Sequence, residues 1–527
     1  RNLSYTEYQK LKQFPIFKLG AYRGGFIVEQ RTVREHPIGK IAERAVGYDD
    51  YRGRVGIEGS FYEFLRGKKG KRLKQKIAKG QWKPLNDNNE IEPIDGKDII
   101  TTIDLKIQDV AHHALLAQLE KFEADHGSVV VMDSKSGEVK AISNLGRTSK
   151  GTYFEQRNYA IYESHEPGST FKLMGMVVAL EDQVIDTSEV IDTEKGVIRF
   201  HGKPVRDSHH GGYGKISAAR VFEVSSNVGI VKIINENYAD QPEKFIAGLE
   251  RMNVGQKIGL PIKGEGQPKI PDPKDKNSWN GLSLPWMAYG YGVSFTPLQT
   301  LTFYNAIANN GEMVKPRFVK EIRAQGSTVT KFEKEVMHPK ICSQETIDKV
   351  KEMMLNVVKR GTADNIYDKN FSMAGKTGTC QTEYWTDETQ YISSFVGYFP
   401  ADEPKYSCIV VIHKPNKKTG YYGNIVAAPV FQSIARKIYS DTPVVEEVDY
   451  AANVQDVEQE YEAYYKKANT SHTKVPDVRN MAGMDAVSLL ENMGYRVRIK
   501  GIGKVKNQSV KAGSPLKKGE VINLELS

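Results

Sequence analysis

The sequence predicts an α+β fold in which helices flank an antiparallel sheet assembled from distant parts of the chain. Two β-rich runs come early, at Val129–Met132 and Val139–Ile142. Three more come late, at Met373–Thr379, Ile392–Tyr398 and Ser407–His413. Helical and loop segments occupy most of the chain between them. Strands at both ends with helices in the middle are typical of an α+β plan, since the early and late strands must meet in one sheet.

Local patterns justify the individual elements. Ile99–Ile103 predicts a short strand, and Asp104–Phe122 predicts an amphipathic helix because its apolar residues recur near helical spacing. The turn cluster from Asp133 to Gly137 joins the two early runs and predicts a hairpin. Val426–Tyr439 predicts a closing helix. These elements would form the main folding unit of the chain.

A length of 527 residues is too great for one hydrophobic core, so we expect about three folding units. Residues 1–97 are rich in Gly, Arg and Lys and predict an irregular, mixed α/β region. Residues 98–441 form the main unit. Residues 442–473 are acidic and polar, which indicates a linker or an exposed helix. Residues 474–527 predict a small α/β domain with a thin core.

That small domain contains three expected elements. Asp485–Met493 predicts a helix, and Arg496–Ile499 and Val521–Leu526 predict strands.

Composition narrows the class of protein. Charged residues make up 26% of the chain and the mean hydropathy is −0.49, which suits a soluble globular protein. No run of eighteen apolar residues is present, so no transmembrane helix is expected. The chain starts with Arg1 and has no secretory signal pattern, so we interpret it as an ectodomain trimmed of its anchor. A cytosolic protein is the alternative.

Charge and cysteine content exclude further classes. The net charge is +9, and residues 1–97 carry 21 Lys+Arg against 12 Asp+Glu. Their basic stretch Arg66–Lys79 lacks interleaved aromatic residues, so we expect no nucleic-acid partner but a solvated face near a membrane or the cell wall. Cys342, Cys380 and Cys408 are too few for a disulfide scaffold and lack the spacing of a zinc site. No metal and no cofactor are expected.

The sharpest chemical signal is the segment Glu166-Pro-Gly-Ser-Thr-Phe-Lys172. The residues after Phe171 are apolar on every face, which indicates a buried helix with Ser169 at its N-terminus. Free N–H groups there favour developing negative charge. Lys172 lies three residues on, on the same face, and burial would lower its pKa so that it could accept the serine proton. The alternative is that Ser169 is a helix cap and Lys172 a surface residue.

Two further motifs follow. Ser225-Ser226-Asn227 comes 56 residues after Ser169, where Ser225 could relay a proton and Asn227 could hold a substrate amide. Lys376-Thr377-Gly378-Thr379 comes 151 residues later, at the end of the strand run Phe371–Ala374. Its lysine and hydroxyls could bind a carboxylate, Gly378 could admit a substrate backbone, and the Thr379 N–H could join that of Ser169 in an oxyanion hole. A polar triplet such as Ser225-Ser226-Asn227 is also common in turns.

In this order and spacing, the three motifs resemble the signature set of penicillin-binding proteins and serine β-lactamases. The resemblance is closest to class B penicillin-binding proteins, the monofunctional transpeptidases, and it covers nearly the whole chain. Further segments that resemble this family are Gly290-Tyr291-Gly292, Thr296–Gln299, Asn309–Gly311 and Gly361–Ala363. The implied fold is the transpeptidase fold, an antiparallel sheet flanked by helices, after an N-terminal pedestal. There is no transglycosylase-like segment, and the anchor and first part of the pedestal are expected to have been removed.

The last unit resembles a PASTA domain, a module found in penicillin-binding proteins and Ser/Thr kinases. The matching residues are Val475–Val478, Ala486, Leu490, Gly494-Tyr495, Gln508-Ser509 and Ala512-Gly513. Val510 replaces the proline that usually follows Gln-Ser, so its turn could differ. A single such unit could stabilise the fold, dock a partner or bind glycan.

The resemblance implies a reaction. Ser169, deprotonated by Lys172, attacks the carbonyl between two terminal D-alanines of a peptidoglycan stem peptide, and Ser225 assists the departure of D-alanine. Lys376, Thr377 and Thr379 read the terminal carboxylate. An amine from a second stem resolves the acyl-enzyme and forms the cross-link. β-Lactams mimic the dipeptide and would trap Ser169.

The resemblance also implies a setting. The Glu-Pro-Gly-Ser-Thr-Phe-Lys motif and the PASTA unit favour the division-specific branch over the elongation branch. This branch implies an inner-membrane anchor, a periplasmic catalytic domain and a membrane glycosyltransferase of the division machinery as partner. Two other functions compete. A β-lactamase would need a base that activates water, and none is identifiable; a wall-binding or sensor protein would bind β-lactams or glycan without catalysis.

Overall fold

The computed structural model describes residues 5–28, 39, 41–51, 53–71, 73–78, 81–84, 91, 94–383, 389–441, 466–467, 473–515 and 517–527. The chain divides into two compact units, Arg1–Asp441 and Thr442–Ser527. None of the described helices is long and apolar enough to cross a membrane.

A six-stranded antiparallel sheet forms the centre of the first unit, in the order β17-β18-β19-β6-β7-β8. Its strands are β6 (His126–Asp133), β7 (Val139–Arg147), β8 (Tyr153–Phe154), β17 (Ala374–Thr382), β18 (Gln390–Phe399) and β19 (Tyr406–His413). The early hairpin β6–β7 joins the late meander β17–β18–β19 where β19 pairs with β6. The prediction of one sheet built from distant segments is therefore confirmed, and the early–late junction lies at its middle.

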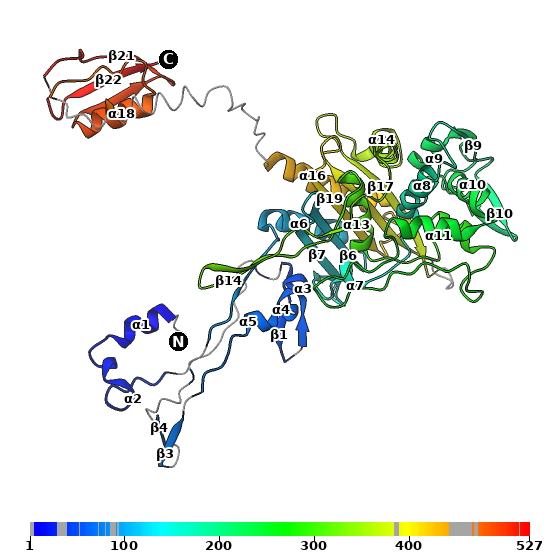
Figure 1. Ribbon diagram of the computed structural model, residues 1–527, viewed down its shortest axis with the longest axis horizontal. Helices are drawn as coiled ribbons and strands as arrows, with labels where there is room; N and C mark the ends of the chain where they lie inside the picture. Colours follow the sequence, from blue (N-terminus) through cyan, green and yellow to red (C-terminus); the bar gives the residue numbers. More distant parts are fainter. Residues whose placement is uncertain are drawn as a thin grey trace. The chain divides into compact units, whose positions relative to one another are not determined.

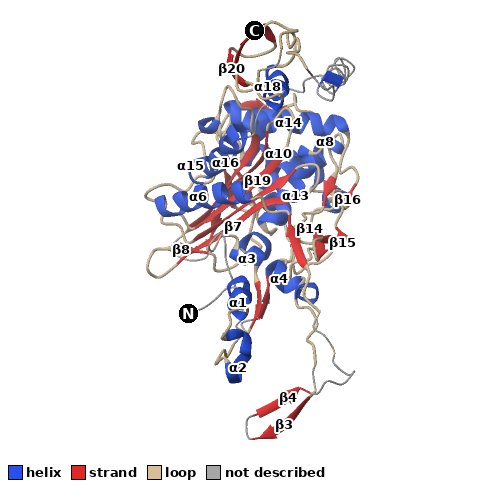
Figure 2. Cartoon of the chain, turned by 90° about the vertical axis from the view of Figure 1, so that its left-hand side faces the viewer, coloured by secondary structure: helices blue, strands red, loops and turns tan. Residues whose placement is uncertain are grey.

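Helices cover both faces of this sheet (Figure 2). α6 (Leu105–Lys121) and α16 (Ala428–Asp441) pack on one face, where they contact each other and the central strands. α13 (Pro297–Ala308) packs on the other face and is buried along its whole length. A capping box between Thr296 and Gln299 starts α13, and its proline at the first turn suits a helix entry. The described apolar residues of the unit form one continuous core across these layers.

A helical lobe follows β8 and carries the first two sequence motifs (Figure 1). Its helices are α7 (Tyr159–Tyr162), η2 (Gly168–Phe171), α8 (Lys172–Glu181), α9 (Ala218–Glu223), α10 (Asn227–Tyr238), α11 (Pro242–Arg251), α12 (Ser283–Ala288), α14 (Gln344–Arg360) and η3 (Asp364–Ile366). The short α15 (Gly423–Val426) instead contacts β18 and α16. Two-stranded sheets pair β9 (Val190–Asp192) with β12 (Lys215–Ser217), the hairpin strands β10 (Val197–Phe200) and β11 (Lys203–Arg206), and β13 (Met313–Val314) with β16 (Val336–His338). Every α8 residue from Lys172 to Leu180 is buried, as the all-apolar pattern predicts.

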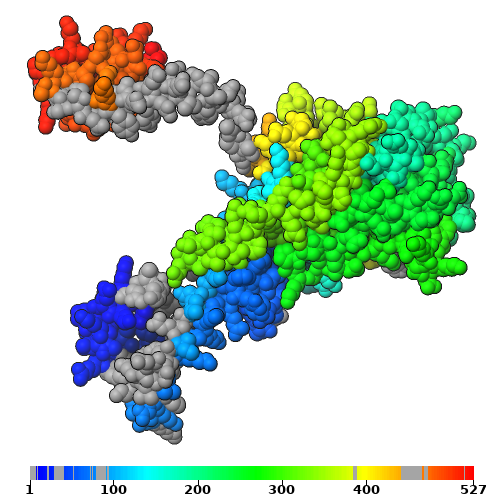
Figure 3. All heavy atoms as spheres, in the orientation of Figure 1, coloured from blue at the N-terminus to red at the C-terminus, as the bar shows by residue number. Residues whose placement is uncertain are grey.

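The N-terminal part of the first unit is irregular, with short helices and two hairpins. Its elements are α1 (Tyr5–Lys12), η1 (Phe17–Leu19), α2 (Gly20–Arg23), α3 (Glu43–Val46), β1 (Tyr48–Asp50), β2 (Gly53–Val55), α4 (Gly56–Ser60), α5 (Tyr62–Leu65), β3 (Lys74–Ala78) and β4 (Gln81–Pro84). β5 (Asp98–Thr101) pairs with β14 (Val319–Ala324), which continues to β15 (Ser327–Lys331). In Figure 3 this late hairpin forms a ridge beside the N-terminal segment, and Phe332 at its end meets Phe61 edge-on at 5.8 Å.

Residues 473–515 and 517–527 of the second unit form a three-stranded sheet and the helix α18 (Gly483–Asn492). Strand β22 (Val521–Leu526) runs parallel to β20 (Arg496–Lys500) and antiparallel to β21 (Val505–Gln508), beside α18. Nine buried side chains form its core, which is thin as expected: Val475, Val478, Ala486, Leu489, Leu490, Tyr495, Val505, Ile522 and Leu524. The predicted helix and two strands are confirmed, whereas β21 was not predicted. The acidic linker predicted for residues 442–473 lies almost wholly outside the described residues.

Two predicted elements of the first unit need correction. The strand predicted at Met373–Thr379 is confirmed as β17 (Ala374–Thr382), so the motif Lys376–Thr379 lies inside a strand and not after a strand run Phe371–Ala374. The closing helix is interrupted between α15 and α16 at Ala427, two residues before Pro429. Proline lacks an N–H and fixes its φ angle, so it suits the first turn of a helix and not its middle.

Candidate active site

Ser169 lies in a single 3-10 turn, η2, immediately before α8 and not in the α-helix itself. One backbone angle and three hydrogen bonds shape this turn. Gly168 has a φ of +55°, its N–H donates to the Gly290 carbonyl at 3.1 Å, and the Thr170 hydroxyl donates to the Pro167 carbonyl at 2.8 Å. A glycine adopts the positive φ without steric cost. The buried Tyr304 hydroxyl also donates to the Thr170 carbonyl at 2.8 Å, which ties the turn to α13.

Gly290 packs directly against the backbone of this turn. A Cβ atom at Gly290, whose φ is +91°, would lie 2.0 Å from the Gly168 carbonyl oxygen. We expect Gly290→Ala to lower the melting temperature and slow acylation of Ser169, because a left-handed strain of about 1–2 kcal/mol adds to an overpacking cost of about 1–3 kcal/mol. Gly292→Ala is the matched control, since its φ is +76° but nothing lies within 4 Å of the added atom. Equal melting temperatures for the two variants would contradict this role of Gly290.

Lys172 is completely buried, and its amine lies among polar atoms of the second motif. The Nζ atom donates to the Ser225 carbonyl at 2.7 Å and to Asn227 Oδ1 at 2.7 Å, and it lies 3.1 Å from the Ser225 hydroxyl. Burial lowers the pKa of Lys172 to about 7, although the Asp207 carboxylate partly opposes this shift. A large fraction of Lys172 is therefore neutral near neutral pH, as the sequence predicted.

The geometry suits a neutral amine at this position. A neutral amine has two N–H donors and one lone pair. The two carbonyl oxygens at 2.7 Å take both donors, which leaves the lone pair available for a hydroxyl proton. The arrangement orients Lys172 as a proton acceptor.

Hydrogen bonds from neighbouring residues hold the second motif in place. Ser225 has a φ of +56°, a strained conformation for a residue with a side chain. Its neighbour Ser226 caps α10 and donates to both carboxylate oxygens of Asp207 at 3.0 Å, while the Val228 N–H donates to Asp207 at 3.0 Å. The Asn227 side chain donates to the Arg206 carbonyl at 2.7 Å. These contacts fix both Ser225 and Asn227 relative to Lys172.

The third motif lies on the edge strand β17, whose residues alternate between two faces. Thr377 and Thr379 face a cleft, and both hydroxyls are oriented by partners: Thr377 Oγ1 lies 2.6 Å from Thr362 Oγ1, and Thr379 Oγ1 accepts from the Gly423 N–H at 3.0 Å. Lys376 is fully buried behind them, where its Nζ donates to the Thr377 carbonyl at 3.1 Å. Burial, reinforced by nearby Lys172, lowers the pKa of Lys376 well below its usual value.

Gly378 makes room for the protein's own chain. A Cβ atom there would lie 2.2 Å from the Ser394 hydroxyl and 2.9 Å from Thr170 Cγ2. The sequence interpretation gave this space to a substrate backbone; the structure fills it with β18 and the turn that carries Ser169. The glycine therefore lets the first and third motifs pack together.

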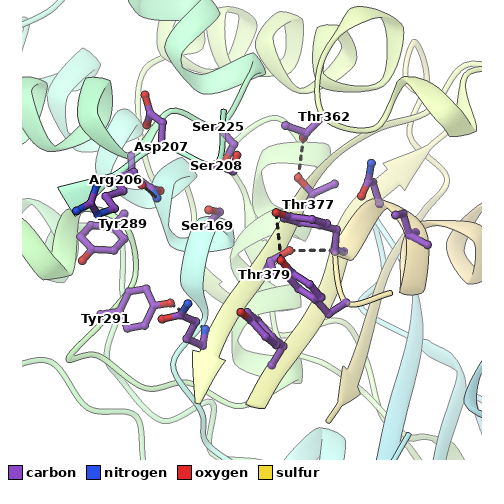
Figure 4. Close-up of a pocket in the computed structure, with 18 of the residues that line it drawn as sticks. Ser169, Arg206, Asp207, Ser208, Ser225, Tyr289, Tyr291, Thr362, Thr377 and Thr379 are labelled. Carbon is purple, nitrogen blue, oxygen red and sulfur yellow. Dashed lines mark hydrogen bonds between the residues drawn. The ribbon is translucent and has the colours of Figure 1, made fainter. Parts of the chain in front are cut away.

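The cleft between these motifs has a volume of about 670 Å³ (Figure 4). It brings together five of the expected site residues, which line it directly: Ser169, Ser225, Asn227, Thr377 and Thr379. Figure 4 shows Ser169 facing the cleft between Ser225 and Thr379. Lys172, Lys376 and Gly378 are outside this lining set, in the walls behind it.

Sequence reasoning missed the rim of the cleft. Aromatic side chains and an arginine line it beside the three motifs: Arg206, Trp286, Tyr289, Tyr291, Tyr391, Tyr421 and Tyr422. Tyr291 also accepts a hydrogen bond from the Gln381 N–H at 2.9 Å, so it spans from the helical lobe to β17. The Gly-Tyr-Gly segment around Tyr291 carried a signal, but Tyr421 and Tyr422 lie in a loop with no distinctive pattern. Aromatic faces and an arginine suit a peptide with apolar and anionic groups.

Comparisons with known proteins agree with this geometry. The family described as the penicillin binding protein transpeptidase domain matches residues 127–436, which is more than half of the chain. The PASTA domain matches residues 473–527.

Individual relatives cover most of the chain. Stage V sporulation protein D of Bacillus subtilis is 29% identical over 516 residues, which are 95% of this chain and 77% of that protein. Penicillin-binding protein PbpB of Mycolicibacterium smegmatis is 30% identical over 430 residues, 77% of this chain and 64% of that protein. The crystal structure of penicillin binding protein 3 from Mycobacterium tuberculosis matches with a TM-score of 0.66 and 27% identity, covering 78% of this chain and 91% of that one.

The sheet, the buried lysine under a serine-lined cleft and these matches agree with one another. The chain belongs to the penicillin-binding protein transpeptidase family, as a class B member with a C-terminal PASTA domain.

Proposed function

We propose that this chain is a serine D,D-transpeptidase that cross-links peptidoglycan stem peptides through an acyl-enzyme on Ser169. The observation that carries the proposal is the Lys172 amine, buried and held by two carbonyl oxygens, beneath a cleft that Ser169 lines. A relative at 27% identity is named peptidoglycan D,D-transpeptidase FtsI, from Buchnera aphidicola.

The acylation step follows from this placement. Neutral Lys172 takes the proton of the Ser169 hydroxyl, and the alkoxide attacks the carbonyl between two D-alanines. The N–H groups of Ser169 and Thr379 stabilise the oxyanion; fixed donors of this kind contribute about 3–4 kcal/mol each. The proton then passes from Lys172 through Ser225, 3.1 Å away, to the departing amine of D-alanine.

Carboxylate recognition is assigned to β17. The hydroxyls of Thr377 and Thr379 face the cleft and can donate to the terminal carboxylate of the stem peptide. Lys376 lies behind them without lining the cleft, and its amine donates to the Thr377 carbonyl, so its role is to hold this wall in place. Asn227 uses its amide to hold Lys172 and the Arg206 carbonyl, so its role is to position the base.

The competing functions lack support in the site. A β-lactamase needs a base that activates water against the acyl-enzyme. Glu166 is outside the cleft lining, and its Oε1 accepts from the Gly292 N–H at 2.8 Å. Asp207 is the acid among the described lining residues, and both of its oxygens accept hydrogen bonds from Ser226. A sensor without catalysis would not need a buried lysine with a pKa of about 7 behind a cleft that a serine lines.

Intact-mass analysis after exposure to ampicillin separates the three functions. We expect a single covalent adduct per chain that persists for many turnover times, because the acid among the described lining residues, Asp207, has both oxygens engaged by Ser226. A relative, penicillin binding protein 3 of M. tuberculosis, has been crystallised in complex with ampicillin. Rapid loss of the adduct with release of hydrolysed drug would identify a β-lactamase. The absence of any adduct would leave a binding protein.

The proposal also covers the cellular process, the location and the partner of the protein. We assign the chain to cell division, with an anchor in the cytoplasmic membrane, a periplasmic catalytic unit and a membrane glycosyltransferase as partner. The relation to Stage V sporulation protein D and FtsI supports the division branch. Co-purification of the full-length protein with a membrane glycosyltransferase from cross-linked cells tests the partner; recovery with elongation proteins alone would contradict it.

A further inference from the structure

A second cavity, of about 720 Å³, contains a cluster of imidazole and carboxylate groups that the transpeptidase reaction does not use. Ligand atoms of His126, Glu163 and His413 all lie within 4.8 Å of one another there. His126 and His413 are direct register partners on the neighbouring antiparallel strands β6 and β19, so their side chains share a face. Glu163 directly follows α7, which packs on β6. Strand register and one helix end thus bring the three residues together.

We propose that His126, Glu163 and His413 form a Zn²⁺ site that fastens the segment leading to Ser169 onto the central sheet. Two imidazoles and one carboxylate are a ligand set that suits zinc, and the cavity leaves a fourth position for water. Glu163 lies six residues before Ser169, so a metal bond at Glu163 would restrict the approach to the catalytic turn. The sequence expectation of no metal considered the cysteines only.

The surroundings of the cluster fit this role. Asp125 Oδ2 accepts from His126 Nδ1 at 2.9 Å, which leaves Nε2 pointing to Glu163 at 2.7 Å. A carboxylate behind a ligand histidine is the usual arrangement that fixes its tautomer and orientation. Zinc would replace the proton shared by His126 and Glu163, and Glu163 would move outward, because two ligands of a tetrahedral zinc are about 3.3 Å apart.

An ion pair of His126 with Asp125 and Glu163 would not explain why His413 is buried beside them. Only 7% of His413 is exposed, and among the described residues its ring makes no hydrogen bond; its nearest partner is Glu163, at 4.0 Å. Its ring stacks on His126 at 4.1 Å and meets His165 edge-on at 5.1 Å. An imidazole nitrogen without a hydrogen-bond partner keeps a lone pair that can bind a metal ion.

The proposal is tested on the purified chain after removal of metal with a chelator. Titration with Zn²⁺ is followed by calorimetry, and titration with Co²⁺ by visible absorption. We expect one ion per chain, a rise in melting temperature with Zn²⁺, and the intense d–d bands of four-coordinate Co²⁺. Octahedral-type Co²⁺ absorption would overturn the site. A thiolate-to-cobalt charge-transfer band would overturn the ligand set, because Cys380 lines the same cavity outside the cluster.

Variants locate the ion. Glu163→Gln should abolish binding, and Asp125→Asn, which leaves all three ligands in place, should weaken it about 10- to 100-fold. His113→Gln is the matched control, an exposed histidine on α6 that already has an acidic neighbour, Asp109, and it should bind Zn²⁺ as the parent chain does. Unchanged affinity in Asp125→Asn and Glu163→Gln would overturn the proposal. Acylation of Ser169 by a β-lactam is measured in parallel, so failure here is separable from failure of the transpeptidase function.

Discussion

Replacing Ser169 with alanine is expected to abolish covalent labelling by β-lactams completely. The Ser169 hydroxyl is the nucleophile in the proposed reaction, and loss of a nucleophile costs more than about 10⁴-fold in related serine mechanisms. Incubation with a fluorescent penicillin, followed by denaturing electrophoresis and intact-mass analysis, measures the effect directly. The loss should come without unfolding, since η2 is held by backbone contacts and by Tyr304 and not by the serine side chain.

Ser164→Ala is the matched control for this experiment. Ser164 lies in the same connecting segment, but its hydroxyl donates to the Gln267 carbonyl at 3.0 Å and does not line the cleft. It should label like the parent chain. Labelling that persists in Ser169→Ala would place the nucleophile elsewhere and end the proposed mechanism.

Replacing Lys172 with methionine is expected to slow acylation about 10²- to 10⁴-fold, the usual contribution of a general base. Methionine fills a similar volume without a lone pair, so the buried position stays occupied. Stopped-flow measurement of the second-order acylation rate gives the magnitude, and circular dichroism and melting temperature check the fold. A folded variant that acylates at the parent rate would remove Lys172 from the role of base.

The parent chain should show the titration of this lysine. Because the base must be neutral and the pKa of Lys172 is about 7, the rate should reach a plateau above that pH. Below it, each unit of pH should cost about a factor of ten, as the neutral fraction falls. Lys172→Met should lose this dependence. A rate that stays constant from about pH 5.5 to about pH 8.5 in the parent would show that burial does not bring the pKa of the base into this range.

Hydrophobic periodicity was sufficient for most elements near the site. The all-apolar run after Phe171 predicted a buried α8, and the prediction was right to the last residue of the run, Leu180. The late strands were placed within a few residues. The 3-10 turn at Ser169 was missed because it depends on a hydrogen bond from Gly168 to Gly290, more than a hundred residues away. The break before α16 was missed because proline at the first turn of a second helix looks the same, in sequence, as proline within one.

The sequence by itself determined which residue types are present and in what order: a serine, a lysine three residues on, and two polar motifs at family spacing. It also determined that Lys172 would be buried, because the residues around it are apolar on every face. Only the tertiary structure decided what the lysine contacts, that Gly378 accommodates the protein's own chain, and that Lys376 lies behind the cleft wall. The register of β6 and β19, which places His126 beside His413, could not be predicted from the sequence either. The physical reason is that hydrogen bonds and packing between distant segments leave no periodic trace in sequence, whereas burial along one helix or strand does.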